Sequence, residues 1–416
     1  MELSIICRET VKPSSLPLDH LKPYKVCLFD QITPITYPTM IIFYRSPDQN
    51  FNDNFPQSLA VRAGRTKDNF YVDDFDAGVT YIEARVNCSL TEFFELRQTE
   101  LLDKFVPFPP LRNEKEYSGE TEVLPQMGFQ VNIFACGGIA LGTSFCHKIA
   151  DAGSVCHFLM SWATTFRGSP ENIVRPNLTS ASVVFPPRDS LPPKYQTLTD
   201  RFWFQHRNPV TRGFVFDENS ISALRELAKS EGVPEPSPND VLTCFIWKCM
   251  SATLATATGG ARRASVMAQV VKIRPRMKSK ALKSSIGNLF WYSLAASSHV
   301  DMVELCELVR TLRESLLSFN EFLDGAHQGK LTFITNWERF FNEVDFGWGK
   351  PIWVGAHGKA GRLMNATVLV EAQGGKVIEA FVTLEESHMA ALEKDPKFLA
   401  FASLNPEGVP PIYSML

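Results

Sequence analysis

A histidine, an aspartate and a glycine stand close together in segment 144–153, which reads SFCHKIADAG. They are His147, Asp151 and Gly153. An imidazole has an ordinary pKa of about 6.5, so it can take up a proton near neutral pH and return it. His147 is therefore a candidate general base, and Asp151 is a candidate carboxylate to orient it. Gly153 would let the backbone bend without the steric cost of a Cβ atom.

The spacing alone leaves the role of Asp151 open. In a helix, His147 and Asp151 would share one face, whereas in a turn the carboxylate could point away from the ring, toward a cation. The same short pattern also fits a structural histidine in the core, followed by an aspartate that caps a helix. Further evidence is needed before the motif predicts a catalytic base.

Neighbouring residues suggest other chemistry that fits the sequence less well. Segment 142–146 reads GTSFC and lacks the final glycine of a serine-hydrolase nucleophile elbow. Cys146 adjoins His147, and consecutive strand residues point to opposite faces, so the two make a poor nucleophile and base pair. The ten-residue spacing of Cys136, Cys146 and Cys156 matches no common set of metal ligands, and no metal is expected.

Segments with the pattern of strands precede the motif, at residues 38–44, 80–86, 129–136 and 139–145. The last two flank Gly137-Gly138, which is a strong hairpin signal. After Gly153, apolar residues recur at spacings of three and four from Val155 to Trp162, which indicates an amphipathic helix. His147 is thus expected at a strand-to-helix junction.

The second half of the chain alternates strand and helix signals in the same way, with strands at 212–216 and 266–273 and helices through 221–227 and from Pro238. The proline-rich stretch 185–194 reads as an exposed crossover. We predict an α/β fold with mixed sheets in two similar domains. The first spans 1–187 with the histidine motif, 188–205 form the linker, and 206–416 form the second domain.

The composition indicates a folded enzyme or binding protein. The chain has 416 residues, of which 44% are hydrophobic and 21% charged, and its net charge is −3. Nothing in this balance favours nucleic acid or an anionic membrane as a partner. Its nine cysteines are dispersed, and no apolar run is long enough for a signal or a membrane span. We expect reduced thiols and a cytoplasmic monomer.

A second motif, DFGWGKP, lies at 345–351, and the two motifs together are far more specific than either one alone. Together, HKIADAG and DFGWGKP resemble the BAHD family of plant acyl-CoA-dependent acyltransferases. The resemblance extends along most of the chain, through segments 29–31, 81–86, 136–138, 214–217, 273–277 and 287–288. It is strongest to the vinorine synthase-like branch, which contains acetyltransferases that act on alkaloids and small alcohols.

The resemblance implies two domains like those of chloramphenicol acetyltransferase, with a solvent tunnel at their interface. Acyl-CoA, with acetyl as the first expectation, would enter from one face and a small-molecule alcohol from the other. His147 would act as general base in O-acyl transfer to a plant specialised metabolite, without a covalent acyl-enzyme. The condensation domains of peptide synthetases carry a double histidine, whereas Cys146 stands before His147 here. This difference favours a free-standing CoA enzyme.

The resemblance also assigns supporting roles. Asp151 would form a salt bridge with Arg274 of the opposite half rather than react. Asp345, Gly347 and Trp348 would be architectural, and the indole N–H of Trp337 is a candidate oxyanion donor. Five basic residues of the second half are candidates to bind the CoA phosphates, and they can equally be solvated surface charges. They are Arg262, Arg263, Lys278, Lys280 and Lys283.

Some positions depart from the family pattern. The chain between Tyr44 and Ala63 is shorter than usual, Lys272 stands where asparagine is common, and Asn336 where serine is common. The missing segment would normally pack near the histidine, so a more open pocket is one expectation. A weakly catalytic protein that binds a ligand or a partner, and an N-acyltransferase, therefore remain as alternatives.

Overall fold

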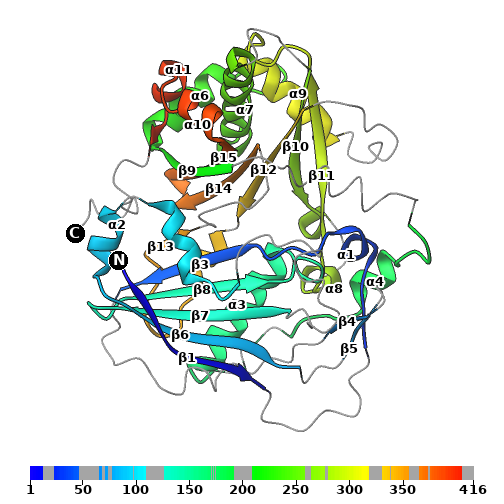
Figure 1. Cartoon of the computed structure of the whole chain (residues 1–416). Coiled ribbons are helices and arrows are strands. Elements are labelled where there is room, and N and C mark those ends of the chain that lie inside the picture. Colours follow the sequence, from blue (N-terminus) through cyan, green and yellow to red (C-terminus); the bar gives the residue numbers. More distant parts are fainter. Residues whose placement is uncertain are drawn as a thin grey trace.

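Two large β-sheets with flanking helices make up the computed structural model of the chain (Figure 1). The structure describes residues 1–12, 23–45, 65–67, 71–73, 77–96, 98–108, 126–169, 171, 173, 175–191, 209–257, 264–276, 280–317, 330–337, 339–355, 365–372 and 375–404. The segment after Tyr44 that is shorter than the family pattern lies mostly outside these residues, as does most of the expected linker.

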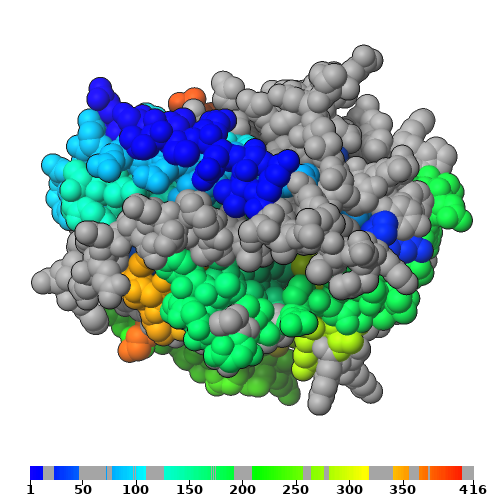
Figure 2. Space-filling model, turned by 90° about the horizontal axis from the view of Figure 1, so that it is seen from below, coloured from blue at the N-terminus to red at the C-terminus, as the bar shows by residue number. Residues whose placement is uncertain are grey.

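The first sheet has six strands in the order β1-β6-β7-β8-β3-β13. Its strands are β1 (Leu3–Val11), β3 (Thr39–Tyr44), β6 (Val79–Val86), β7 (Met127–Phe134), β8 (Ile139–Phe145) and β13 (Trp353–Gly355). Strands β6 and β7 run parallel, and the other neighbours are antiparallel. The edge strand β1, dark blue in Figure 2, lies at the surface, and most of its residues are exposed.

The predicted hairpin before the motif is confirmed. Strands β7 and β8 pair from Met127 opposite Phe145 to Ile133 opposite Ile139. Gly137 adopts a φ of 81°, a value that glycine reaches without steric cost, in the turn between them. The hairpin therefore delivers His147 just beyond the last residue of β8.

The second sheet has seven strands in the order β11-β10-β12-β14-β15-β9-β16. They are β9 (Pro209–Phe216), β10 (Ser265–Lys272), β11 (Phe290–Ser297), β12 (Lys330–Trp337), β14 (Ala366–Ala372), β15 (Val377–Glu385) and β16 (Ser403–Leu404). Strand β12 is parallel to both β10 and β14, whereas the other pairs are antiparallel. A small third sheet joins β2 (Tyr24–Lys25), β5 (Tyr71–Asp73) and β4 (Arg65–Lys67).

The α-helices are α1 (Leu28–Ile32), α2 (Leu90–Glu95), α3 (Ala152–Phe166), α4 (Ser180–Val184), α6 (Glu218–Ala228), α7 (Pro238–Ala257), α8 (Lys280–Lys283), α9 (Leu305–Leu317), α10 (Glu386–Leu392) and α11 (Pro396–Leu399). Short 3₁₀ turns are η1 (Thr99–Phe105), η4 (Arg274–Arg276) and η7 (Arg339–Glu343). The expected helix after Gly153 is α3, and the two expected in the second half are α6 and α7. Helices α3 and α6 extend a few residues beyond the predicted segments at their ends, and α7 begins at Pro238, as predicted.

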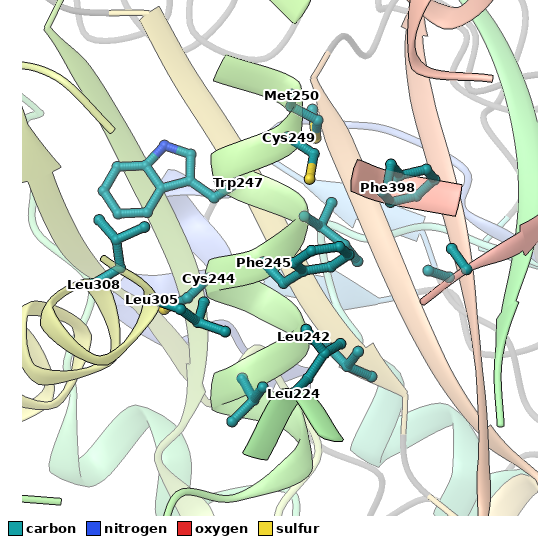
Figure 3. Packing of buried hydrophobic residues seen from close by; sticks show 14 of the residues in the cluster. Leu224, Leu242, Cys244, Phe245, Trp247, Cys249, Met250, Leu305, Leu308 and Phe398 are labelled. Atoms are coloured by element: carbon teal, nitrogen blue, oxygen red, sulfur yellow. The ribbon is translucent and has the colours of Figure 1, made fainter. Parts of the chain in front are cut away.

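Helix α7 forms the centre of the largest apolar core. Trp247 projects from one side of this helix toward α9, and Leu242 and Phe245 project from the other side toward α6 and α11 (Figure 3). The indole N–H of Trp247 donates a hydrogen bond to Ser265 Oγ at 2.9 Å, which satisfies the one polar group of this fully buried side chain. This core holds α7 against the second sheet.

One short strand of the second half belongs to the first sheet. Strand β13 pairs with β3, with Trp353 opposite Phe43. The indole N–H of Trp353 donates back to Glu379 Oε2 of β15 at 2.9 Å, so this residue contacts both halves. The division into domains at 188–205 stays a prediction, and β13 shows that any such division is crossed by an exchanged strand.

All nine cysteines are free thiols in the structure. Among the described residues, no helix has both the length and the apolar character that a membrane span requires.

Candidate active site

His147 lies between the end of β8 and the start of α3. Its backbone N–H donates to the carbonyl of Thr36 at 2.9 Å, which fixes the chain as it leaves the sheet. The ring packs near Phe290 of β11, with ring centroids 5.6 Å apart, and near Phe145, at 6.2 Å. The residue as a whole is half-buried, and aromatic residues of both halves pack around its ring.

Asn288 sets the tautomer of this ring. Its Oδ1 lies 3.0 Å from His147 Nδ1, and its Nδ2 donates to the backbone carbonyl of His147 at 2.7 Å. An amide oxygen only accepts hydrogen bonds, so Nδ1 must be the donor and carry the hydrogen. In the neutral ring the lone pair is then on Nε2, which is the atom available to act as a base.

The pKa of His147 is lowered from its ordinary value. The main cause is burial, which disfavours the charged imidazolium. The hydrogen bond to Asn288 and the negative charges of Asp151 and Asp30 act in the opposite direction without overcoming it. The ring is therefore neutral at physiological pH and ready to accept a proton.

Asp151 is turned toward Arg274. Its Oδ2 accepts from Arg274 Nη1 at 2.5 Å and from the backbone N–H of Leu289 at 3.0 Å. Its Oδ1 accepts from the N–H of Ser154 at 2.8 Å, so Asp151 is also the N-cap of α3. Of the arrangements that the spacing left open, the described contacts correspond to a cap and a salt bridge, with His147 Nδ1 facing Asn288 instead.

Arg274 connects α3 to the segment that carries Asn288. Its Nη2 donates to Ser154 Oγ, to the Ser285 carbonyl and to the Gly287 carbonyl, each at 2.9 Å. A Cβ atom at Gly153 would lie 3.1 Å from Arg274 Nη1. Glycine at this position therefore gives the guanidinium its room, which is a different reason from the bend that the sequence suggested.

The loop of the second motif packs at the far end of α3. Asp345 Oδ1 accepts from the N–H groups of Gly347 and Gly349 at 2.7 and 3.0 Å, and both glycines have φ near 90°. The ring of Phe346 contacts Trp162 of α3, with centroids 4.9 Å apart. Helix α3 has 15 residues, and at 1.5 Å per residue it is about 22 Å long. The loop is therefore well removed from His147.

Trp348 completes this packing. Its ring lies 5.3 Å from that of Tyr44 in β3 and 6.0 Å from that of Phe166 near the end of α3. The Tyr44 hydroxyl donates to the carbonyl of Val344 at 2.8 Å, which ties the loop to the first sheet. Arg167 also donates to the carbonyl of Asp345. These contacts are structural in kind, because none of them reaches the imidazole.

The rival nucleophiles lie in unsuitable surroundings. Gly142 and Ser144 lie within β8 rather than in a sharp strand-to-helix turn, and Ser144 is buried. Burial raises the pKa of the Cys146 thiol to about 11, so thiolate is scarce at neutral pH. A serine or cysteine nucleophile next to His147 is thus disfavoured.

Other predicted residues fall at or beyond the limits of the described structure. Trp337 is the last residue of β12, and its side chain is not among the described ones. Arg262, Arg263 and Lys278 lie outside the described residues, whereas Lys280 and Lys283 bound α8 and Lys283 is exposed. The roles proposed for these residues stay predictions.

Asp30 and Asn288 are the site residues that sequence reasoning missed. Both occur in segments that carry the family resemblance, but neither belongs to the HKIADAG or DFGWGKP motif. Asp30 is fully buried, and its Oδ1 accepts from the backbone N–H and from Nδ2 of Asn288 at 2.7 and 3.0 Å. The sequence signal for Asp30 is its position between apolar residues, which predicts burial. A buried carboxylate needs hydrogen-bond partners, so such a residue indicates a polar contact in the core.

Known proteins resemble this chain over nearly its whole length. The family model described as the Transferase family matches residues 1–330 and 297–399. Akuammiline synthase 2 of Alstonia scholaris is 33% identical over 445 residues, which cover 98% of each chain. Limonoid 7-O-acetyltransferase of Citrus sinensis is 31% identical over 462 residues, which cover 98% of this chain and 99% of the relative.

Solved structures agree with these matches. The crystal structure of vinorine synthase superposes with a TM-score of 0.80 and 28% identity, over 97% of this chain and 99% of that one. TRI101 of F. sporotrichioides, crystallised with coenzyme A and T-2, has a TM-score of 0.71 at 17% identity and shares the fold. The predicted mixed α/β architecture is thereby confirmed. The chain belongs to the BAHD family of acyltransferases, in which it is similar to the vinorine synthase-like branch, and it is an acyltransferase that transfers groups other than aminoacyl groups.

Proposed function

We propose that this enzyme transfers an acyl group, acetyl in the first instance, from acyl-CoA to a hydroxyl of an alkaloid or limonoid-type plant metabolite. His147 Nε2 is the general base, and no acyl-enzyme forms. The observation that carries the proposal is the contact between His147 Nδ1 and Asn288 Oδ1, since it leaves the lone pair on Nε2 of a half-buried ring.

The proposed reaction has one addition and one elimination. Nε2 of His147 takes the proton of the acceptor hydroxyl as its oxygen attacks the thioester carbonyl, which gives a tetrahedral oxyanion and an imidazolium. The oxyanion then collapses, the C–S bond breaks, and the imidazolium proton goes to the departing CoA sulfur. A positioned base contributes about 10²–10⁴-fold to such a step. Trp337 is proposed to donate to the oxyanion.

The surface next to the ring supports the proposed acceptor class. Lys272 stands opposite Phe290, and Val270 opposite Tyr292, so the four side chains share one face of β10 and β11. All four are half-buried, and the ring of Phe290 lies 5.6 Å from His147 and 5.7 Å from Tyr292. A partly open aromatic strip that begins at the base suits a broad apolar skeleton. A tunnel between the halves is proposed to run over it.

The donor is proposed by similarity and by charge. Relatives of the chain include a limonoid 7-O-acetyltransferase, and TRI101, which shares the fold, was crystallised with coenzyme A. Lys280 and Lys283 on α8, with Arg262, Arg263 and Lys278, are proposed to bind the CoA phosphates. Asp151 and Arg274 are proposed to keep the site in shape, and Asp345, Gly347 and Trp348 to join the halves.

The direct test is turnover. Purified protein is incubated with acetyl-CoA and a panel of alcohols, and free thiol is followed together with the mass of the acylated product. We expect rigid polycyclic alcohols to be acetylated with a KM well below that of short linear alcohols, because only they cover the aromatic strip. Normal folding without thiol release from any acyl-CoA, with any alcohol or amine, would contradict the proposal and favour a binding protein.

The pH dependence of kcat/KM gives a second test. The base must be neutral to accept a proton, and burial places the pKa of His147 below 6.5. Activity should therefore rise with pH through a midpoint below 6.5 and be level at neutral pH, since kcat/KM reports the free enzyme. A rise centred clearly above 6.5 would count against this ring as the base.

A further inference from the structure

A buried carboxylate that takes no part in the proton transfer lies directly behind Asn288. Asp30 of α1 has no exposed surface, and its Oδ1 accepts two hydrogen bonds from Asn288. Its Oδ2 accepts from the backbone N–H of Cys27 at 2.8 Å and from the Tyr24 hydroxyl at 3.1 Å. Burying a carboxylate is costly, and these four donors offset that cost without a cation among the described hydrogen-bond partners of Asp30.

The hydrogen-bond partners of Asn288 permit one orientation of its amide. The NH₂ group faces two acceptors, which are Asp30 Oδ1 at 3.0 Å and the His147 carbonyl at 2.7 Å. A half-turn of the amide would set its oxygen against both acceptors and its NH₂ against His147 Nδ1. The ring would then prefer the tautomer with hydrogen on Nε2, which cannot act as the base.

We propose that Asp30 is a positioning residue for acyl transfer, and that it acts through Asn288 to hold His147 in the tautomer with hydrogen on Nδ1. The inference rests on the proposed function of His147 as general base. It gives a role to a carboxylate that neither motif contains.

The surrounding structure holds Asp30 against Asn288. Gly287 has a φ of 119°, and a Cβ atom there would lie 3.0 Å from the Tyr24 hydroxyl and 3.2 Å from Asp30 Oδ2. Only glycine lets the chain pass so close to the carboxylate. From the other side, Lys148 Nζ donates to the carbonyl of Gln31 at 2.9 Å, which ties the segment of His147 to the helix of Asp30.

The orientation of the Asn288 amide does not depend on the charge of Asp30. Burial raises the pKa of this carboxyl, and it also raises the pKa of Tyr24, which keeps its hydroxyl proton. A proton on Asp30 would sit on Oδ2 and face the Tyr24 hydroxyl, which can accept, so Oδ1 would still accept from Asn288. The other titratable groups at this corner are Cys27, Lys148, Asp151 and Arg274.

Two variants separate orientation from charge. Asp30→Leu keeps the branched shape but removes the acceptor, whereas Asp30→Asn keeps one acceptor oxygen, which should face the two donors of Asn288. Protein labelled with ¹⁵N-histidine is examined by NMR, and the His147 signals are assigned by their loss in His147→Ala. We expect hydrogen on Nδ1 in the wild type and in Asp30→Asn, and a shift toward Nε2 in Asp30→Leu.

Kinetics give the second readout. We expect kcat to fall at least about tenfold further in Asp30→Leu than in Asp30→Asn, within the about 10²–10⁴-fold that a base contributes, with the KM for acyl-CoA unchanged. The matched control is Asp240→Asn, a buried carboxylate paired with Arg313, which should change neither tautomer nor kcat.

The outcomes are distinct. Hydrogen on Nε2 in the wild type, or the same tautomer in folded Asp30→Leu as in the wild type, would overturn the role of Asp30. If Asp30→Leu does not fold, an altered tautomer in Asp30→Asn would overturn it instead. Full activity of His147→Ala would contradict the proposed function of His147 as general base. The NMR signals of the other proteins would still report which His147 nitrogen carries the hydrogen.

Discussion

Replacing His147 with alanine is expected to lower the rate of thiol release by about 10²–10⁴-fold, the contribution of a positioned base. The fold should survive, because the ring is half-buried and its one described side-chain hydrogen bond is to Asn288. The effect should appear in kcat with little change in the KM for acyl-CoA, since the imidazole is proposed to act on the acceptor proton. Steady-state kinetics on protein with an unchanged circular dichroism spectrum measure both quantities.

His299→Ala is the matched control for this variant. His299 follows β11 and is exposed, so the same substitution there should leave kcat and KM as they are. A His147→Ala enzyme that turns over at nearly the rate of the control would remove the general base from the proposal. Thiol release must be measured with and without an alcohol, because a lost alcohol-dependent rate is the result that bears on the base.

Breaking the pair between Asp151 and Arg274 is expected to produce the largest loss of stability. Their side chains are 9% and 15% exposed, and removing one partner leaves the other charge largely buried without its counter-charge. Such losses are about 3–5 kcal/mol in the free energy of unfolding. The double variant should lose less than the sum of the single ones, with a coupling of about 0.5–3 kcal/mol. Urea unfolding of the wild type, the two single variants and the double variant measures these free energies.

An exposed ion pair serves as the comparison. Glu307 and Arg310 lie three residues apart on α9, and both side chains are about half exposed. The same cycle on this pair should be close to additive, because solvent screens the two charges. Additivity at Asp151 and Arg274 as well would show that the buried bridge contributes no coupling, and the proposed role in shaping the site would fail.

The local part of the site could be read from the sequence. The strand pattern at 139–145 and the helix pattern that begins after Gly153 are local signals that flank His147. They predicted a base at a strand-to-helix junction, and the structure places His147 there. The salt bridge to Arg274, implied by the resemblance, is also present as a contact.

The partners of His147 could not be read from periodicity, because they come from far along the chain. Asn288 stands 141 residues from His147, and Asp30 stands 258 residues from Asn288. Hydrophobic patterning indicates which faces are buried, but it does not indicate which polar side chains meet in a buried corner. Strand β13 was missed for another reason: three residues are too few to show an alternation.

The exchanged strand β13 bears on any attempt to take this enzyme apart. A recombinant fragment that stops within the linker would lack β13, and the hydrogen-bonding groups of β3 around Ile41 and Phe43 would lose their neighbour. An uncovered sheet edge of that composition recruits further copies of itself and aggregates. Split versions of the protein, for reporter or complementation work, would therefore need both pieces produced together, so that the second supplies the missing edge as the first one folds.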